Sequence, residues 1–176
     1  MPLWRILLYL RNEPNNSYHD RNVRAMEKDS IVYRKLVTND ETAFAGLVRL
    51  FNREFESVDP EYVNAQNIEL LLGRPEFVCI AAFDGDEIVG GITAYELRMY
   101  DRPGSAMYLY DLAVAEKTRR RGIGSGLVRE LQAYCRRTGI RELFVQADSS
   151  DEHALAFYDS LSGRPSMAVQ YSFDLV

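Results

Sequence analysis

Residues 118–127, TRRRGIGSGL, place three arginines next to three glycines that are spaced two residues apart. Glycine permits positive φ and lets an anion come close to main-chain N–H groups. Where such a turn opens a helix, the free N–H groups of the first turn and the helix dipole favour a phosphate. The stretch therefore predicts a phosphate-binding turn, although a solvated arginine-rich loop would have the same composition.

Two other phosphate-binding motifs compete for this turn. A Walker A loop requires Gly-Lys followed by Ser or Thr, which the stretch lacks, so an NTPase P-loop is excluded. A dinucleotide fingerprint would need glycine where Leu127 stands, although Asp148 after the next strand suits that motif. Seven residues separate Val114 from Gly122, which is too long for the tight turn of a dinucleotide site.

Carboxylates form a second group of residues that could do chemistry. Asp111 interrupts the otherwise apolar run 107–115, MYLYDLAVA, so it needs either a buried partner or a function. Further acidic residues gather at and after the next strand, where they would attract a cationic ligand. They are Asp148, Asp151, Glu152 and Asp159. Two of them, Asp151 and Glu152, would alternatively stabilise a helix N-terminus through its dipole.

The elements that position these residues follow from the periodicity of apolar side chains. The segment 31–37, IVYRKLV, has the pattern of a strand. Thr38 and Glu41 have the spacing of a capping box, which predicts that a helix starts there. Asp59-Pro60 predicts the start of a second helix.

The central part of the chain predicts a hairpin, a buried strand and a third helix. FVCIAAF and IVGGITAYELRMY flank Asp84-Gly85, which is a hairpin signal. The run 107–115 is apolar on both faces, as is typical of a central strand. The helix after the glycine turn has an apolar face and a stop at Gly139. That face consists of Leu127, Leu131 and Cys135.

The last part of the chain predicts a strand, a helix and a final strand. ELFVQAD has the pattern of a strand, and Ser149 with Glu152 forms a second capping box. A half-buried strand is predicted from alternating apolar residues, which are Met167, Val169, Tyr171, Phe173 and Leu175. The resulting order, β-α-α-β-β-β-α-β-α-β, predicts an α+β fold, an α/β sandwich around a mixed sheet.

Composition narrows the class of protein. The 176 residues suggest one domain, and the net charge of −5 with a pI of about 5.1 argues against a general nucleic-acid-binding surface. No apolar run approaches the roughly 20 residues that span a membrane. The N-terminal MPLWRILLYL is short and interrupted by Arg5, which argues against a signal peptide. We expect a cytoplasmic protein.

Metal and disulfide chemistry are not expected. Cys79 and Cys135 lie among apolar residues and are interpreted as core residues, and His19 and His153 are far apart in the sequence. Residues 1–30 are interpreted as an extension without an assigned role, and the domain is expected over residues 31–176.

Three motifs in the right order resemble the GNAT superfamily of N-acetyltransferases. Arg119-x-x-Gly122-x-Gly124 matches its R/Q-x-x-G-x-G/A loop, and LYDLAV stands where that superfamily has a bulged strand. ALAFYDSL, 154–161, matches an A-x-x-[FL]-Y-x-x-L helix. The runs YLYDLAVAEKTRRRGIGSGL, VQADSSDEHALAFYDSL and LFNREF further resemble the GNAT-fold aminoglycoside 3-N-acetyltransferases.

The resemblance implies a mixed, mostly antiparallel sheet flanked by about four helices and an acetyl-CoA site. Residues implied in binding that cofactor are Leu112, Ala113, Val114, Arg119, Arg120, Arg121, Gly122, Ile123, Gly124, Ser125, Gly126, Ala154 and Tyr158. Acetyl would pass to the 3-amino group of a deoxystreptamine ring, with Asp111 as the base and Tyr158 as the acid that protonates the CoA sulfur. Residues implied in contacting the acceptor are Glu54, Tyr110, Asp111, Asp148, Asp151 and Glu152.

Alternatives remain at this point. A GNAT enzyme for a polyamine or a protein amino group would use the same acidic cleft, and an acyl-CoA-binding module would need no turnover. Asp111 could be a structural carboxylate, Tyr158 a core residue and Glu54 part of a solvated helix face. Where the family is expected to have glycine after Leu161, this chain has Ser162. The resemblance is compatible with a homodimer, in which the alternation over 167–175 would serve either an interface or the core of one subunit.

Overall fold

The computed structural model describes residues 31–175, so the predicted extension over 1–30 lies outside the described residues. The elements follow in the order β1 (Val32–Leu36), α1 (Glu41–Glu54), α2 (Ala65–Leu72), β2 (Phe77–Asp84), β3 (Glu87–Arg98), β4 (Ser105–Val114), the 3₁₀ turn η1 (Glu116–Thr118), α3 (Ile123–Thr138), β5 (Glu142–Val145) and α4 (Glu152–Ser160).

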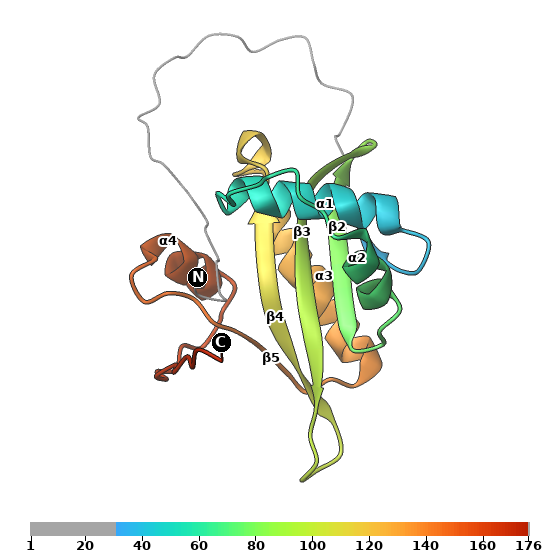
Figure 1. The fold of residues 1–176 in the computed structure, drawn as a ribbon. Helices are drawn as coiled ribbons and strands as arrows, with labels where there is room; N and C mark the ends of the chain where they lie inside the picture. The colour runs from blue at the N-terminus through green and yellow to red at the C-terminus, as the bar shows by residue number, and fades with distance from the viewer. Residues whose placement is uncertain (1–30, 176) are drawn as a thin grey trace, which may run out of the picture.

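The five strands form one sheet in sequence order, β1-β2-β3-β4-β5 (Figure 1). The first three pairings are antiparallel and β4 pairs with β5 in parallel. The mixed, mostly antiparallel sheet and the four helices confirm the expected fold class.

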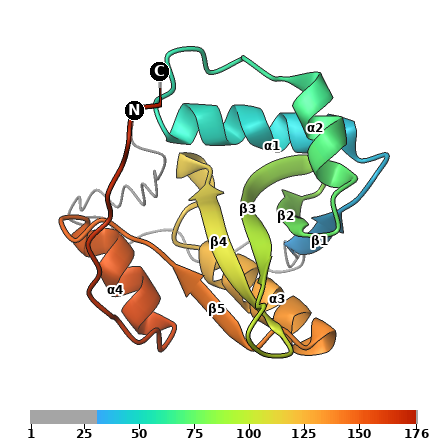
Figure 2. The ribbon, with the colours of Figure 1, turned by 60° about the horizontal axis from the view of Figure 1, so that its bottom comes forward.

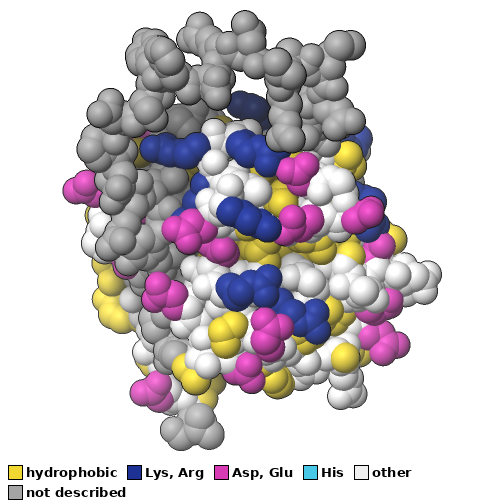
Figure 3. Space-filling model, turned by 90° about the horizontal axis from the view of Figure 1, so that it is seen from above, with side chains coloured by type: hydrophobic (Ala, Val, Ile, Leu, Met, Phe, Trp, Pro, Cys, Tyr) yellow, Lys and Arg dark blue, Asp and Glu magenta, His cyan; other side chains and the backbone are white. Residues whose placement is uncertain are grey.

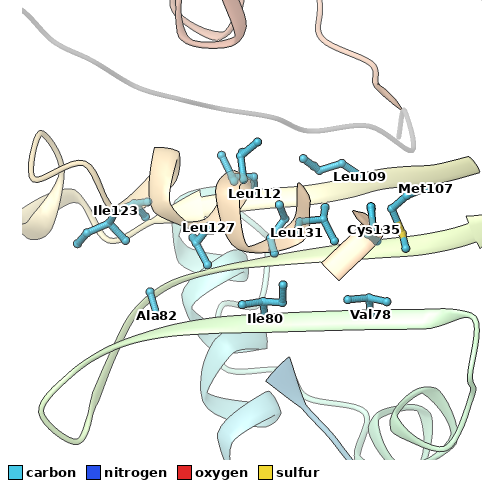
Figure 4. Packing of buried hydrophobic residues seen from close by; sticks show 14 of the residues in the cluster. Val78, Ile80, Ala82, Met107, Leu109, Leu112, Ile123, Leu127, Leu131 and Cys135 are labelled. Atoms are coloured by element: carbon cyan, nitrogen blue, oxygen red, sulfur yellow. The ribbon is translucent and has the colours of Figure 1, made fainter. Parts of the chain in front are cut away.

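Helices cover both faces of the sheet (Figure 2), with α1 and α2 on one face and α3 on the other. On the α3 side, Leu127, Leu131 and Cys135 pack against strand residues such as Val78 and Ile80, which confirms the predicted helix face (Figure 4). On the other side, α1 lies so close to β3 that a Cβ at Gly91 would collide with Leu47. Helix α4 lies beside the β5 edge of the sheet (Figures 1 and 2).

Glycine and cysteine positions confirm three sequence predictions. The turn between β2 and β3 contains Asp84-Gly85, with Gly85 at φ 60°. Helix α3 ends at Gly139, which has φ 78° and donates its N–H to the Cys135 carbonyl. Cys79 and Cys135 are buried free thiols.

A bulge in β4 confirms the irregularity that the resemblance implies. Thr93 of β3 pairs with Asp111 and Ala94 pairs with Leu109, so Tyr110 is an extra residue on β4. A bulge of this kind turns two consecutive side chains toward the same face of a sheet. Tyr110 contacts the ring of Tyr95 and Asp111 contacts Thr93, so both lie on the face that α1 and α2 cover.

The structure corrects the start of the first two helices. Helix α1 begins at Glu41 with Asp40, not Thr38, as its N-cap residue. Helix α2 begins at Ala65, where the Asn64 side chain accepts a hydrogen bond from the Asn67 N–H at 3.0 Å. The earlier signal at Asp59 folds a local turn instead, because its carboxylate accepts from the Glu61 N–H.

The predicted cap of the last helix is also corrected. The carboxylate of Asp148 accepts from both the N–H and the hydroxyl of Ser150, so 148–150 form a turn rather than a helix start. Asp151, not Ser149, is the N-cap of α4 and accepts from the Ala154 N–H at 2.9 Å. A capping box read from spacing alone does not distinguish between neighbouring polar residues.

The predicted final strand is wrong for the described residues. Residues 163–175 contain no helix or strand, and the five alternating apolar side chains are exposed, from 77% at Val169 to 94% at Met167. Alternation shows that a segment suits a half-buried strand, but pairing also needs a free sheet edge within reach. Among the described residues, β5 is an edge strand and this segment does not pair with it.

Candidate functional site

A cavity of about 490 Å³ lies between the glycine turn and α4. Its wall consists of Val114, Arg119, Arg120, Gly122, Ile123, Gly124, Ser125, His153, Ala156, Phe157 and Ser160. The structure therefore brings the glycine turn, the end of β4 and one face of α4 around a single space.

The backbone at the start of α3 suits an anion. Gly122 is the N-cap in the left-handed conformation, with φ 77° and ψ 9°, and it provides no side-chain cap. The first turn carries no acidic residue, and a Cβ at Gly122 would meet nothing within 4 Å. The N–H groups of the first turn and the helix dipole thus face open space at which a phosphate can be bound.

Of the three arginines, two are engaged with carboxylates of distant elements. Arg119 forms an ion pair with Glu54 at the end of α1, and its Nε donates to the Val114 carbonyl at 3.1 Å. Arg121 pairs with Asp84 at 2.7 Å and does not line the cavity. Arg120, with φ 66°, lines the cavity and has no ion pair within residues 31–175.

Glu54, which sequence reasoning placed against the acceptor, holds the chain that leads into the glycine turn. One oxygen of its carboxylate accepts from the Glu116 N–H at 3.2 Å and the other pairs with Arg119. Both partners of the pair are nearly buried. This contact joins the C-terminal end of α1 to the start of η1.

The face seen in Figure 3, from above Figure 1, shows Lys and Arg side chains interspersed with Asp and Glu. Within the described chain, cations of the turn region form ion pairs with carboxylates, as in Lys117–Glu87 and Arg121–Asp84. Positive charge around the turn is therefore local, which agrees with the negative net charge of the whole chain.

Several residues predicted to bind the cofactor lie outside the cavity wall. Leu112, Ala113 and Ala154 are buried in the interior. Gly126 lacks a side chain where the Tyr33 hydroxyl of β1 packs, since a Cβ there would collide with it. The first three are interior residues, and none of these positions forms the wall.

The α4 residues on the wall were missed by the sequence analysis. They are His153, Ala156, Phe157 and Ser160. Their spacing of three, one and three residues marks one face of a helix, so the signal was present in the sequence. The motif match pointed instead to Ala154 and Tyr158, which lie on the adjacent face of the helix.

The C-terminal half of β4 has a free edge within the described chain. Strand β5 pairs only with the segment from Ala106 to Leu109, while β3 pairs with β4 as far as Val114. After the bulge, the backbone groups that would point toward β5 are left open to a ligand. Backbone donors near Leu112 to Val114 are suited to polarising a carbonyl oxygen.

Asp111 is a largely buried carboxylate on the α1/α2 face of the bulge. Its Oδ2 accepts from the Thr93 hydroxyl at 2.7 Å. Burial raises the pKa of Asp111 to about 6, although the hydrogen bond from Thr93 opposes this shift. The carboxylate is therefore mostly ionised at pH 7 and close enough to neutrality to take up a proton.

A row of aromatic rings crosses the sheet next to Asp111. Tyr110 contacts Tyr95 at 5.6 Å and Tyr108 at 5.9 Å between ring centroids, and Tyr108 stacks on Phe144 of β5 at 5.1 Å. Burial raises the pKa of the three tyrosines, which keeps them as neutral hydrogen-bonding groups. Such a wall can stack on sugar rings and attract cations.

The Tyr158 hydroxyl is buried and, among the described residues, has no hydrogen-bond partner. Burial raises its pKa above the ordinary value, so the phenol stays protonated and can donate. Its ring contacts that of Phe157, which lines the cavity, at 5.0 Å. An unpaired buried donor is costly, which makes a functional role reasonable.

The acidic cluster after β5 is explained in part by local structure. Hydrogen bonds from the Ser150 N–H and hydroxyl lower the pKa of Asp148, which is partly exposed. Asp151 caps α4 and Glu152 is exposed in its first turn. Within the described part of the chain, no group of three or more His, Cys, Asp or Glu is placed to hold a metal, and no helix is long and apolar enough to cross a membrane.

Comparison with protein families assigns the chain. Residues 44–163 match the family described as "Acetyltransferase (GNAT) family", which covers more than half of the chain. The chain belongs to the GNAT acetyltransferase family. It is an acetyl-CoA-dependent N-acetyltransferase, and the open helix N-terminus at the cavity fits the phosphates of that cosubstrate. A search of curated proteins gave no match.

Solved structures of this acetyltransferase fold include two aminoglycoside acetyltransferases from uncultured soil metagenomic samples. One, meta-AAC0020 in complex with sisomicin, is 32% identical with a TM-score of 0.80, covering 83% of this chain and 97% of its own. The other, HMB0005, is 31% identical with a TM-score of 0.77, covering 84% and 99%. AAC(6')-Iy in complex with CoA, at 14% identity and a TM-score of 0.72, shares the fold over 87% of this chain and 100% of its own.

Proposed function

We propose that this acetyltransferase acts on aminoglycosides, transfers acetyl to the 3-amino group of the deoxystreptamine ring, and thereby confers antibiotic resistance. The observation that carries the proposal is the placement of Asp111: a largely buried carboxylate on β4, next to an aromatic wall and on the strand whose C-terminal half has a free edge. The likeness to two aminoglycoside acetyltransferases at 31–32% identity supports the acceptor class. The choice of the 3-amino group rests on the sequence resemblance alone.

The acceptor amine must lose a proton as it attacks the acetyl carbonyl. We assign this proton to Asp111, directly or through a water molecule, because its pKa of about 6 leaves it ionised at neutral pH. As the new C–N bond forms and the C–S bond breaks, the sulfur takes a proton from the Tyr158 hydroxyl. Backbone N–H groups near Leu112 to Val114 would stabilise the oxyanion.

Cosubstrate binding is assigned to the cavity. The N-terminus of α3 and Arg120 would hold the phosphates, with Gly122 leaving room for them, while the absence of a side chain at Gly124 lets the Phe157 ring pack close to the turn. On the acceptor side, Tyr110 contributes to the aromatic wall, and Asp148, Asp151 and Glu152 are proposed to attract the polycation through their field. Glu54 is the least supported acceptor contact, since its carboxylate is already used by Arg119.

The test measures release of CoA thiol from acetyl-CoA with gentamicin, sisomicin, spermidine and a lysine peptide, each against a blank without acceptor. We expect turnover on the aminoglycosides and acetylation of N3 in the product, as located by NMR. Turnover restricted to spermidine or the peptide would replace the proposed acceptor with another amine. Binding of acetyl-CoA without any turnover would favour a binding module.

Variants assign the roles. Asp111→Asn is expected to lower kcat by about 10²–10⁴ and Tyr158→Phe by about 10², as is usual for loss of a general base or acid. The exposed Asp86→Asn, in the β2–β3 turn, is the matched control and should leave kcat unchanged. Full activity of Asp111→Asn would exclude it as the base.

We also propose a homodimer formed through the segment over residues 167–175. Its five exposed apolar side chains alternate with other residues in the sequence, and β5 offers a free edge within the described chain. An exposed segment of this pattern is a pairing site for another strand. Light scattering should give a dimer that is weakened by Val169→Lys with Tyr171→Lys, and a monomer for the unaltered chain would contradict it.

A further inference from the structure

Thr93 occupies a position on β3 that links it to the neighbouring strands on both sides. It pairs across the sheet with Cys79 of β2 and with Asp111 of β4. The side chain is only 4% exposed, and it is one of three buried polar or charged residues of the described chain. A hydroxyl buried in an apolar strand needs a partner, and Thr93 finds it in the carboxylate of Asp111.

The hydrogen bond makes the two oxygens of that carboxylate inequivalent. Oδ2 accepts from Thr93 at 2.7 Å, and no other donor to Asp111 is present among residues 31–175. Oδ1 has no hydrogen-bond partner there, yet it is not fully buried. The one fully buried side-chain N or O atom without a partner in the described part is the Tyr158 hydroxyl. Oδ2 is therefore fixed by Thr93, whereas Oδ1 accepts no hydrogen bond within residues 31–175 and is not fully buried.

The other groups that act on the charge of Asp111 do not stabilise it. Cys79 faces it from β2, Tyr95 from β3, and Tyr108 and Tyr110 from β4. The pKa of each is raised, so all four are neutral at pH 7. No Lys or Arg within residues 31–175 forms an ion pair with Asp111. The Thr93 hydroxyl is left as the group that favours the charged form.

We propose that Thr93 is the positioning residue for the base of this enzyme: its hydroxyl fixes Oδ2 of Asp111, keeps the carboxylate ionised, and leaves Oδ1 to receive the proton of the acceptor amine. Thr93 itself gives up and receives no proton in the reaction. This inference rests on the proposed role of Asp111 but not on the identity of the acceptor.

The variant that tests it is Thr93→Val, which keeps the shape of the side chain and removes the hydroxyl, with Thr93→Ser as the matched control. A hydrogen bond to a charged group corresponds to about one to two pH units in the pKa of its acceptor. The acid limb of kcat/KM, which reports the free enzyme, should move up by that amount in Thr93→Val and return in Thr93→Ser.

The expected loss depends on pH. With the limb moved by about 1.5 units, kcat/KM of Thr93→Val should fall by roughly 15-fold at pH 6, by about fourfold at pH 7, and by little at pH 9. The KM for acetyl-CoA should not change, since Thr93 lies away from the glycine turn. A loss that is equal at every pH, with an unmoved limb, would show a merely structural role and overturn the proposal.

A second readout does not depend on turnover. The carboxyl carbon of Asp111, assigned by its absence in Asp111→Asn, can be titrated by NMR without substrate in the unaltered chain and in Thr93→Val. A higher pKa in the variant supports the role of Thr93 even if no aminoglycoside is acetylated, in which case the proposed function alone fails. An unchanged pKa overturns the role of Thr93 whatever the turnover, and Thr93→Ala replaces the valine variant if that one does not fold.

Discussion

Around the glycine turn, where β4 leads into α3, two of three arginines are paired with carboxylates from α1 and β2, and the open features are backbone N–H groups. Around the bulge of the same strand, Asp111 is largely buried next to one hydroxyl and several neutral rings. The proposed anion site thus depends on main-chain geometry in a charge-compensated surface, whereas the proposed acceptor site depends on one carboxylate that has no ion-pair partner among the described residues. The difference teaches that a run of arginines in the sequence overstates what side-chain charge contributes.

Of the two proposed sites, the acceptor site should lower the free energy of unfolding more, because it holds a largely buried charge. Burial raises the pKa of Asp111 from 3.8 to about 6, so between these values the folded protein holds a proton that the unfolded chain has lost. Stability therefore falls as pH rises through this range and stays lower above it. Asp111→Asn should raise the free energy of unfolding by roughly 2–3 kcal/mol at pH 7.5 and change it little at pH 4.

Denaturant unfolding at the two pH values measures this difference. A gain of the same size at both would mean that charge burial is not its cause, and the contrast between the two sites would be lost.

On the cofactor side, the main chain should dominate, and two glycines allow a matched test. Gly122 and Gly139 have nearly the same left-handed conformation at the two ends of α3, and a Cβ meets nothing within 4 Å at either. Alanine should therefore cost about 1 kcal/mol of stability at both positions. Only Gly122→Ala should weaken CoA binding, by about tenfold, because it places a methyl group in the cavity wall.

Calorimetric titration of CoA into the two variants distinguishes the effects. Equal affinity for both would show that the phosphates do not approach Gly122.

The contribution of side-chain charge to CoA binding can be measured by neutralising one arginine at a time. Arg120→Gln should weaken CoA binding by about fivefold at low salt, with a smaller effect at high salt, because this arginine lines the cavity without a carboxylate partner among the described residues. Arg121→Gln should change the affinity less than about twofold, since Arg121 is held by Asp84. The reverse order would restore the arginine run as the main phosphate site.

The smallest effect is expected at the turn that follows α4. Ser162 has φ 63°, a conformation in which glycine is preferred, and follows the C-cap Leu161. Ser162→Gly should raise the free energy of unfolding by about 0.5–1 kcal/mol. Gly163→Ala is the opposing control and should destabilise, since its Cβ would lie 2.9 Å from the Tyr158 carbonyl oxygen. A destabilising Ser162→Gly would show that this turn is held by contacts of the serine.

The sequence predicted the parts of this molecule that depend on local pattern. The apolar face of α3, its glycine stop and the hairpin at Asp84-Gly85 depend on neighbouring residues and are confirmed. The pairing of Arg119 with Glu54 joins residues far apart in the chain, so no local pattern reveals it. Thr93 carried a weak signal, as a hydroxyl in a glycine-rich apolar strand, but its partner depends on the register of β3 and β4.

The predicted final strand shows that a local pattern can also predict an element that the described residues do not form. Its alternation is as regular as that of any confirmed strand, yet the described segment is unpaired and exposed. Pattern specifies which face of a strand is apolar but not which edge receives it. The face of α4 that lines the cavity, from His153 to Ser160, was by contrast predictable, since its helical spacing is present in the sequence.

The bulge at Tyr110 also sets the phase of β4. Before it, the odd-numbered Met107 and Leu109 face α3, and after it the even-numbered Leu112 and Val114 do. Removing this one residue would leave every apolar side chain on its own side of the sheet, because each half keeps its alternation. It would leave Asp111 without the adjacent tyrosine on its face. The strand can thus lose part of the proposed acceptor surface without losing its place in the core. Changes at this one position can therefore alter activity while the packing of the sheet is kept.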